Sequence, residues 1–555
     1  MIDLTTLFPY SFDKKYSKPV AYFSMEFAID QPLKIYSGGL GFLAGSHMRS
    51  AFELKQNLIG IGILWKYGYY DQERNKDGTL QACYIQKDYS FLTDIGIMFP
   101  ITIHNHTVQV KVYLLKPEVF NTVPLFFLST NIPENDYLAQ TICYRLYDSH
   151  ESARIAQSIL LGKGGAKLLD VLGRETAIYH MNEGHALPLC FYLLDKYKSL
   201  SEVKNRVVFT THTPEKAGNE EHPIKTLEVL GFFQGADQKT ISELAAPDEK
   251  NLNYTLTALR MTKKANGVSQ LHGEVSRKMW NGFAGICEIG AITNAQNKPY
   301  WQDKALEKAA KKDDDEALVG RKKELKLELF RVVANQTGKL FDPNVLTLVW
   351  ARRFAGYKRA NLLLTDFERF LKLTTNKERP IQVIWAGKPY PEDQGSINIF
   401  NDIYWKVKDL PNCTILTGYE LWLSSHLKKG SDLWLNNPRM YHEASGTSGM
   451  TAAMNGSVNL SIPDGWVPEF AKHGKNSFII PTAEDSLSQE ERDRIETKNL
   501  FDLLENEVIP LYYKSPAKWL KIVKTAMKDI LPHFDSGRMA REYYEQMYLA
   551  ETAKK

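Results

Sequence analysis

Several cationic side chains come immediately after one apolar segment of the sequence. Residues 345–350 (VLTLVW) have the pattern of a buried strand, and the basic stretch 352–359 (RRFAGYKR) follows it. Lys388 occupies the same place after residues 381–386 (IQVIWA). Arginine forks two phosphate oxygens and lysine adds a compact charge, and both interactions strengthen where water is excluded. This spacing predicts an anion site, with a solvated basic turn as the alternative for residues 352–359.

A glycine-rich loop is a second candidate for anion binding. Residues 37–41 (SGGLG) directly precede a helical pattern at residues 42–55. The backbone amides of such a loop and the N-terminus of the following helix attract phosphate groups. The glycine spacing matches neither nucleotide-binding fingerprint, so an ordinary tight turn is the competing interpretation.

Histidines occur at the ends of two other apolar runs. His180, Glu183 and His185 are close in sequence, but their spacing differs from that of the helical zinc motif H-E-x-x-H. We therefore expect hydrogen-bonding groups that shape a polar pocket, and no metal site. His212, in the segment TTHT, fits equally well a capped core histidine or a ligand for a sugar hydroxyl.

Three glutamates are candidates for glycoside hydrolysis. A retaining glycosidase needs two carboxylates about 5 Å apart, and an inverting one needs about 6.5–9.5 Å. Glu26, Glu183 and Glu443 are the residues in question, but linear sequence gives no separations. Hydrolysis is therefore an alternative without support of its own.

These groups need a scaffold, and the first part of the chain predicts a mostly parallel sheet. From about residue 18 to 300, short β-prone runs alternate with helical patterns. Strands are expected at residues 20–24, 177–180 and 207–211, each followed by a polar loop. Loops at the carboxyl ends of such strands build the ligand site of open α/β sheets. Residues 98–130 partly alternate and predict an antiparallel excursion.

A second set of strand-to-loop units follows the charged residues 302–340, which predict a solvated helical connector. We predict an α/β protein with an N-terminal domain over residues 1–300 and a C-terminal Rossmann-like domain over residues 301–500. Residues 501–555 are expected to be helices that pack back across the domains. The strands of the second set are expected at residues 345–350, 381–386, 413–417, 433–435 and 458–460.

The composition of the chain bears on its partners and its location. A formal charge of +4 over 555 residues argues against a nucleic-acid or membrane partner. The five cysteines are isolated and odd in number, which suggests neither a disulfide framework nor a zinc site. The N-terminal residues lack a basic start followed by a long apolar core. We expect a cytoplasmic protein.

Ten segments of the chain form an ordered set of motifs. Together they resemble the α-glucan phosphorylase family (glycogen, starch and maltodextrin phosphorylases), particularly its short bacterial branch. The correspondence covers most of the chain, and so many motifs in family order make chance negligible. They are YFSMEF (22–27), IYSGGLG (35–41), HMNEGHA (180–186), TTHTP (210–214), NGVSQLHGEVS (266–276), ITN (292–294), ARRFAGYKR (351–359), AGK (386–388), WLNNPR (434–439) and EASGTSGM (443–450).

The resemblance implies a fold and a reaction. The fold is of the glycosyltransferase B type, with two doubly wound Rossmann-like domains facing across a cleft. The activity is that of a retaining glucosyltransferase, which exchanges terminal α-1,4-linked glucose between a glucan and phosphate and yields glucose 1-phosphate. The implied partners are glycogen, starch or maltodextrin together with phosphate or glucose 1-phosphate, and the family leaves an oligomer open.

Carried over position by position, the resemblance also assigns site residues. The catalytic groups are expected to be Arg353 and Lys358, which would hold phosphate, and His212. Lys388 is expected in the cofactor site, where the family holds pyridoxal phosphate. The residues expected to bind the reacting phosphates or the glucosyl unit are Gly38, Gly39, Leu40, His185, Asn294, Tyr357, Glu443, Ser445 and Gly446.

Position 451 departs from the family. Thr451 stands where the family keeps the lysine that forms an imine with pyridoxal phosphate. An imine requires a primary amine, which a threonine hydroxyl does not supply. We therefore expect the cofactor to be absent or bound without a covalent bond to residue 451.

Two alternatives to a phosphorylase follow from this substitution. A glucan synthase independent of pyridoxal phosphate would use a nucleotide-glucose donor, whose distal phosphate would occupy the cofactor pocket. Residue 443 and residue 451 have the spacing of two glutamates in related transferases, but Thr451 is not the second glutamate. A noncatalytic glucan-binding protein is the other alternative. Its uncharged ligand would not need the cations Arg353, Lys358 and Lys388.

Overall fold

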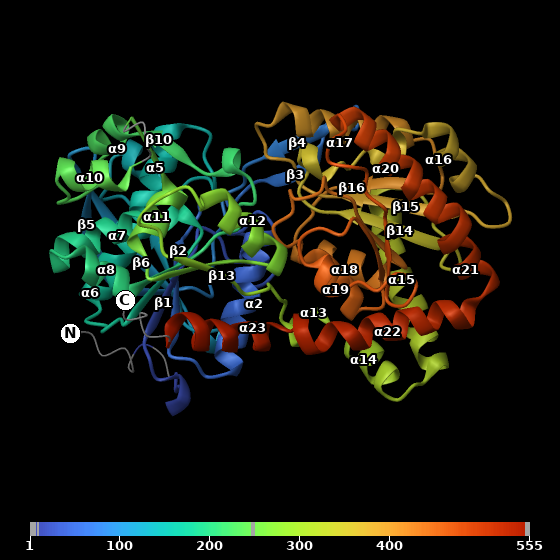
Figure 1. The fold of residues 1–555 in the computed structure, drawn as a ribbon, viewed down its shortest axis with the longest axis horizontal. Coiled ribbons are helices and arrows are strands. Elements are labelled where there is room, and N and C mark those ends of the chain that lie inside the picture. Colours follow the sequence, from blue (N-terminus) through green and yellow to red (C-terminus); the bar gives the residue numbers. More distant parts are fainter. Residues whose placement is uncertain (1–6, 8–9, 246–249, 550–555) are drawn as a thin grey trace. The chain divides into compact units, whose positions relative to one another are not determined.

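The computed structural model describes residue 7, residues 10–245 and residues 250–549 of the chain. These residues form two compact units (Figure 1). The first unit takes its described residues from Met1–Tyr70, Tyr84–Asn294 and Ser536–Lys555, and the second from Asp71–Cys83 and Ala295–Asp535. No helix among the described residues is long and apolar enough to cross a membrane.

The first unit contains a large, mostly parallel sheet. Within the described residues it has nine strands in the order β13-β12-β9-β8-β1-β2-β7-β6-β5. The strands from β13 to β7 run parallel, whereas β6 is antiparallel to both β7 and β5, so the predicted antiparallel excursion is present. The bounds are β1 Val20–Phe23, β2 Leu58–Ile63, β5 Thr93–Ile103, β6 His106–Leu115, β7 Leu125–Ser129, β8 Ile178–Asn182, β9 Val207–Thr210, β12 Lys264–Gly267 and β13 Glu288–Ala291.

Helices and a small hairpin complete the first unit. Strands β10 (Glu221–Pro223) and β11 (Asn251–Asn253) pair antiparallel. Helix α23 contacts α2, the helix that follows the glycine loop. The helices are α2 Gly39–Glu53, α3 Pro117–Phe120, α4 Tyr137–Thr141, α5 Glu151–Ile159, α6 Gly165–Val171, α7 Pro188–Tyr197, α8 Leu200–Arg206, α9 Ile224–Leu230, α10 Gln238–Leu244, α11 Tyr254–Met261, α12 Gln270–Trp280 and α23 Ser536–Glu542.

The second unit is built on an all-parallel sheet. Its described strands follow the order β16-β15-β14-β17-β18-β19, so the order reverses between β14 and β17. In open α/β sheets such a switch point is where ligands bind. An antiparallel pair, β3 (Asp71–Arg74) and β4 (Leu80–Cys83), belongs to the same unit. The sheet strands are β14 Leu346–Ala351, β15 Ile381–Ala386, β16 Cys413–Leu416, β17 Leu433–Asn436, β18 Val458–Ser461 and β19 Ser477–Ile479.

Helices cover both faces of the second sheet, as Figure 1 shows. Leu348 and Trp350 of β14 pack into one core, and Val349 and Ala351 pack into another on the opposite face. This two-sided burial explains why the strands are continuously apolar. The helices are α13 Lys298–Trp301, α14 Lys304–Lys311, α15 Asp315–Thr337, α16 Phe367–Thr374, α17 Gln394–Val407, α18 Leu421–Gly430, α19 Ser448–Met454, α20 Gln489–Leu503, α21 Ile509–Lys514 and α22 Pro516–Phe534.

The charged segment 302–340 differs from the solvated connector that we predicted. Helix α15 buries Leu329 and Val333 in the same core as Val349, and it packs against α18. Lys326 is also buried and forms an ion pair with Asp432 at 2.5 Å. The apolar residues of α15 return at helical spacing within a charged sequence, and the composition of the segment hid that stripe.

The α/β class with parallel sheets is confirmed in both units. All eight strands expected by number are present within one or two residues of the predicted bounds. In the first unit these are β1, β8 and β9, and in the second β14 to β18. Each is short, apolar and followed by a polar loop, which is the signal that periodicity detects best.

Candidate functional site

In the second unit, candidate residues gather where the strand order reverses. Arg352 comes directly after β14 and is buried. Its guanidinium donates to Leu435 O at 2.9 Å and to the side-chain oxygen of Asn436, at the end of β17. Arg352 thus ties the ends of β14 and β17 together. Its neighbour Arg353 is exposed at the start of the following loop.

Lys358 and Glu443 form an ion pair in the same region. Lys358 Nζ lies 2.9 Å from Glu443 Oε2 and 3.1 Å from Oε1, and Arg352 Nη1 lies 4.0 Å from Oε2. Burial raises the pKa of Glu443, but attraction to Lys358 and Arg352 outweighs it and leaves the pKa below its usual value. Glu443 is therefore a largely buried anion flanked by cations.

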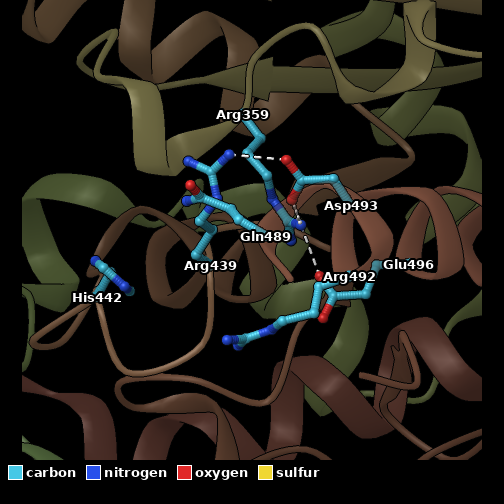
Figure 2. A pocket seen from close by; sticks show the side chains of 7 residues that line it. All are labelled: Arg359, Arg439, His442, Gln489, Arg492, Asp493 and Glu496. Atoms are coloured by element: carbon cyan, nitrogen blue, oxygen red, sulfur yellow. Dashed lines mark hydrogen bonds and ion pairs between the residues drawn. The ribbon is translucent and has the colours of Figure 1, made fainter. Parts of the chain in front are cut away.

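The loop that carries Tyr357 and Lys358 is held by residues that line a small cavity. Its volume is about 100 Å³ (Figure 2). Arg439 N donates to Tyr357 O at 2.8 Å, and the Tyr357 ring stacks on His442. The arginines that line the cavity are paired with acidic side chains, so we interpret them as structural residues that hold this loop in place. It is lined by Arg359, Arg439, His442, Gln489, Arg492, Asp493 and Glu496; Arg359 contacts Asp493 and Glu496, and Arg439 contacts Asp493.

The backbone around Glu443 is held by Asp464. Asp464 is buried and accepts hydrogen bonds from Glu443 N and Gly465 N, both at 2.9 Å. Burial raises the pKa of Asp464 to about 7, and the charge of Glu443 adds to the rise. Gly465 has φ +61°, and a Cβ there would lie 2.3 Å from Ser445 O. Only glycine fits that position.

Ser445 and Gly446 follow in the same loop. Ser445 is buried, and its Oγ has no hydrogen-bond partner among the described residues. Gly446 has φ +83°, and a Cβ there would lie 3.0 Å from Glu443 Cγ. A buried hydroxyl without a partner is costly, so Ser445 Oγ is suited to a ligand that supplies one.

The two residues expected at a cofactor site occupy different environments. Lys388 follows β15 and forms a buried ion pair with Glu420, with Nζ 3.0 Å from Oε1. Thr451 lies within α19 with 0% exposure, and its Oγ1 donates to Ser448 O at 3.0 Å. The hydroxyl of Thr451 is thus satisfied within its own helix.

In the first unit, the glycine loop is organised by Glu26. Glu26 Oε2 accepts from Ser37 N at 2.6 Å and from Gly38 N at 3.1 Å, and Tyr147 donates to Oε1 at 2.8 Å. These two amides therefore bind an internal carboxylate, which differs from our expectation that they face an exogenous anion. Gly39 and Leu40 begin helix α2, and a Cβ built on Gly38 or Gly39 meets no atom within 4 Å. The open space lies over the start of α2.

His212 is placed by the loop that follows β8. His212 Nε2 pairs with Asn182 Oδ1 at 2.7 Å, and His212 N donates to Glu183 Oε2 at 2.7 Å. Burial lowers the pKa of His212 to about 3. The ring is therefore neutral at physiological pH, and because Asn182 Nδ2 already donates to Ser24, Nε2 carries the proton. Glu183 and Glu26 both bind loop amides, which leaves hydrolysis without support.

Two of our candidate residues in the first unit each carry a buried polar atom without a partner among the described residues. His185 Nδ1 and Asn294 Oδ1 have no hydrogen-bond partner within the described part of the chain. His185 lies in the turn after β8 and contacts the ring of Tyr147, and Asn294 lies after β13. His180, in contrast, bonds Tyr548 and Thr210 within the core, so it is structural.

Sequence reasoning missed four residues that organise these loops. Arg352 lies beside Glu443, and Glu420 forms an ion pair with Lys388. Asp464 accepts a hydrogen bond from the backbone of Glu443. Glu26, which we considered only for hydrolysis, binds the glycine loop. Arg352 stood inside the basic stretch but was not distinguished from Arg353. Asp464, in the segment PDGW, gave a turn signal that could have marked it.

The residue at position 451 does not supply the covalent attachment by which the family holds pyridoxal phosphate. Thr451 has no amine, and its hydroxyl is already satisfied. Lys388 is the other residue expected at the cofactor site, and its Nζ is paired with Glu420.

The chain is similar to a family and to several known proteins. The family model described as carbohydrate phosphorylase matches residues 289–506. A maltodextrin phosphorylase of Thermococcus litoralis is 34% identical over 96% of this chain and 71% of its own length. A glycogen phosphorylase of Aquifex aeolicus is 33% identical over 97% of this chain and 87% of its own length. An uncharacterized protein of Methanocaldococcus jannaschii is 49% identical over 96% of this chain and 100% of its own length.

Proposed function

Because the chain belongs to the carbohydrate phosphorylase family, we propose that it is an α-1,4-glucan phosphorylase. The reaction would transfer a terminal glucosyl unit from a glucan to phosphate with retention of configuration, and its reverse would extend the glucan. A glycosyltransferase B-type fold is part of this proposal.

The observation that carries the proposal is that three of the residues assigned to glucose each have a buried polar atom without a partner among the described residues. Ser445 Oγ, His185 Nδ1 and Asn294 Oδ1 lack partners among the described residues, and the resemblance assigns all three to glucose. Leaving such groups unpaired costs about 1–3 kcal/mol each. A polyhydroxylated sugar offers donors and acceptors that would satisfy them. This supports a glucosyl ligand over an apolar one.

The charged residues of the second unit would act on the phosphate. Lys358, held by Glu443, and Arg353, exposed nearby, would hold the anion and stabilise charge as the glycosidic bond breaks. Glu443 would accept hydrogen bonds from ring hydroxyls while keeping Lys358 in place. Asp464 would position Glu443 through its backbone amide.

Pyridoxal phosphate, which the family usually uses, would be held near Lys388 and α19. When bound, it supplies a phosphate group that exchanges protons with the substrate phosphate. Lys388 would contribute a cation whose position is fixed by Glu420. This assignment requires no covalent bond at Thr451.

A product analysis tests the proposal. The purified protein is incubated with maltooligosaccharide and phosphate, and separately with maltooligosaccharide and glucose 1-phosphate, ADP-glucose or UDP-glucose, each with and without pyridoxal phosphate. We expect glucose 1-phosphate from the first mixture and longer glucans from the second. Elongation with a nucleotide sugar alone would establish the synthase alternative. Glucan binding without any product would establish a noncatalytic protein.

A further inference from the structure

Glu183 has a backbone conformation that is nearly confined to glycine. It directly follows β8, with φ +74° and ψ 169°. A side chain in this region costs free energy, and such residues persist only where the surrounding contacts enforce the conformation. Lys198 also has a positive φ in the first unit, but its ψ of 26° places it in the milder left-handed helical region. Strained residues cluster at active sites and ligand clamps, so the contacts that hold Glu183 bear on function.

The contacts of Glu183 join two loops. Its backbone N donates to Thr210 O, at the end of β9, at 2.9 Å. Its Oε2 accepts from His212 N at 2.7 Å and from Thr213 Oγ1 at 3.2 Å. Its Oε1 accepts from Gly184 N at 3.2 Å. Glu183 therefore ties the loop after β8 to the loop after β9 through both its backbone and its side chain.

Each of these two loops carries one imidazole nitrogen that is suited to a hydroxyl group. In the first loop, His185 Nδ1 is buried and has no partner among the described residues. In the second, His212 Nε2 pairs with Asn182 Oδ1 at 2.7 Å and carries the ring proton, so Nδ1 keeps its lone pair as an acceptor. Burial lowers the pKa of His212 to about 3, which keeps this ring uncharged. An uncharged acceptor suits the hydroxyl of a sugar better than it suits an anion.

We propose that Glu183 is a positioning residue that fixes His185 and His212 relative to one another, so that both imidazoles meet hydroxyls of one sugar ring. The inference deepens the proposed function and rests on it for the identity of the sugar as a glucosyl unit. Glu183 itself binds loop atoms. A glycine at this position would adopt the same backbone without strain, but it would not supply the carboxylate that joins the loops.

Thermal unfolding of two variants tests the backbone conformation. Glu183→Ala and Glu183→Gly both lose the carboxylate, but only glycine relieves the strain. We expect Glu183→Gly to unfold at the higher temperature of the two. Glu274, exposed within α12, is the matched control, because glycine is less stable than alanine inside a helix. If Glu183→Gly unfolded at a lower temperature than Glu183→Ala, as at position 274, the strained conformation would be excluded and the inference overturned.

Isothermal titration with a maltooligosaccharide tests the link to the sugar. Glu183→Gln keeps the size of the side chain but turns one acceptor oxygen into a donor, so it breaks the bridge. We expect its affinity for the glucan to fall by about 10- to 100-fold, and that of Glu183→Gly to fall at least as far. Lys198→Gly is the control: Lys198 shares the positive φ but pairs with Asp195, and its replacement should leave the affinity unchanged. Parent affinity in Glu183→Gln would overturn the inference.

Steady-state kinetics separate positioning from a loss of folded protein. The residues proposed to hold phosphate, Arg353 and Lys358, belong to the second unit. In Glu183→Gln we therefore expect the KM for glucan to rise by about 10-fold or more while the KM for phosphate stays constant. A lower kcat with both KM values unchanged would indicate a smaller folded fraction and would contradict a positioning role.

The binding experiment and the product analysis fail independently. Glucan affinity that falls in Glu183→Gln, in a protein that forms no glucose 1-phosphate, would uphold this inference and overturn the proposed phosphorolysis. Glucose 1-phosphate formation with unchanged glucan affinity in Glu183→Gln would uphold phosphorolysis and overturn this inference. A parent protein that binds no glucan would overturn both.

Discussion

Lys358 donates hydrogen bonds to both carboxylate oxygens of Glu443, at 3.1 and 2.9 Å. One residue comes from the loop after β14 and the other from the loop after β17, so the ion pair spans the switch point of the second sheet. The side chains are 12% and 10% exposed. At this burial an ion pair is sensitive to the loss of either partner, because the remaining charge is left poorly solvated.

Replacement of Lys358 by methionine should abolish most of the activity and weaken the fold. Without the cation, Glu443 keeps only Arg352, whose Nη1 is 4.0 Å away. We expect a fall in kcat/KM for phosphorolysis of about 100-fold or more and a loss of unfolding free energy of roughly 3 kcal/mol. Enzyme assays and urea denaturation measure the two effects.

An exposed ion pair provides the control for Lys358. Lys372 pairs with Glu368 on the surface of α16, and both side chains are largely exposed. Lys372→Met should leave activity and stability unchanged within error. If Lys358→Met behaves like Lys372→Met in both assays, Lys358 has no part in the anion site.

Removal of the Ser445 hydroxyl should separate substrate binding from stability. Because Ser445 Oγ has no partner in the described residues, Ser445→Ala should not destabilise the protein. It should weaken glucan binding by about 5- to 100-fold, the value of one buried hydrogen bond. Isothermal titration with a maltooligosaccharide and thermal unfolding give the two quantities.

Ser461 is the matched control for Ser445. It is also fully buried, but its hydroxyl donates to Ile462 O and accepts from Asn436 Nδ2. Ser461→Ala should lower the unfolding temperature through the loss of these bonds. A Ser445→Ala protein that loses stability while retaining full glucan affinity would show that the hydroxyl is structural.

The positions of the candidate residues at strand ends could be predicted, because short apolar strands give a strong local signal. β14 and β15 were expected within one residue of their bounds, and the loops after them carry Lys358 and Lys388. This signal does not show which side chains of a loop point into the protein and which point into solvent. Arg352 and Arg353 are adjacent and chemically alike, yet one is buried against β17 and the other is exposed.

Contacts between distant segments were beyond the reach of local patterns. Glu26 accepts hydrogen bonds from the amides of the glycine loop, and the sequence around residue 26 does not indicate a partner at residue 38. Similarly, Gln72 donates to Gly387 O at 2.7 Å, which joins the β3 segment to the loop before Lys388 within the second unit. Such pairings depend on how whole elements pack, so propensity and periodicity do not determine them.

Replacement of Asp464 by asparagine should change how stability depends on pH. Burial raises the pKa of Asp464 from its usual value to about 7. As pH rises from about 4 to 7, the unfolded chain releases this proton before the folded protein does, and stability is lost by up to about 1.4 kcal/mol per pH unit. Asp464→Asn lacks this titrating group. Its unfolding free energy, measured relative to that of the parent protein, should therefore increase as pH rises from about 4 to 7. Urea denaturation at pH 5, 6, 7 and 8 measures the difference, and a difference that is independent of pH would contradict the raised pKa.

Replacement of His47 by phenylalanine should make the first unit more resistant to acid. His47 is buried between the rings of Tyr22 and Tyr543, and burial lowers its pKa to about 3. As pH falls below about 6.5, the unfolded chain takes up the proton while the folded protein does not, so stability declines by up to about 1.4 kcal/mol per pH unit. Phenylalanine preserves the ring contacts and removes the titration, so the stability curve of the variant should be flatter between pH 6.5 and 4. The exposed His106, replaced by phenylalanine, serves as the matched control for urea denaturation across this range. An unchanged slope in His47→Phe would show that His47 takes up its proton in the folded protein as readily as in the unfolded chain.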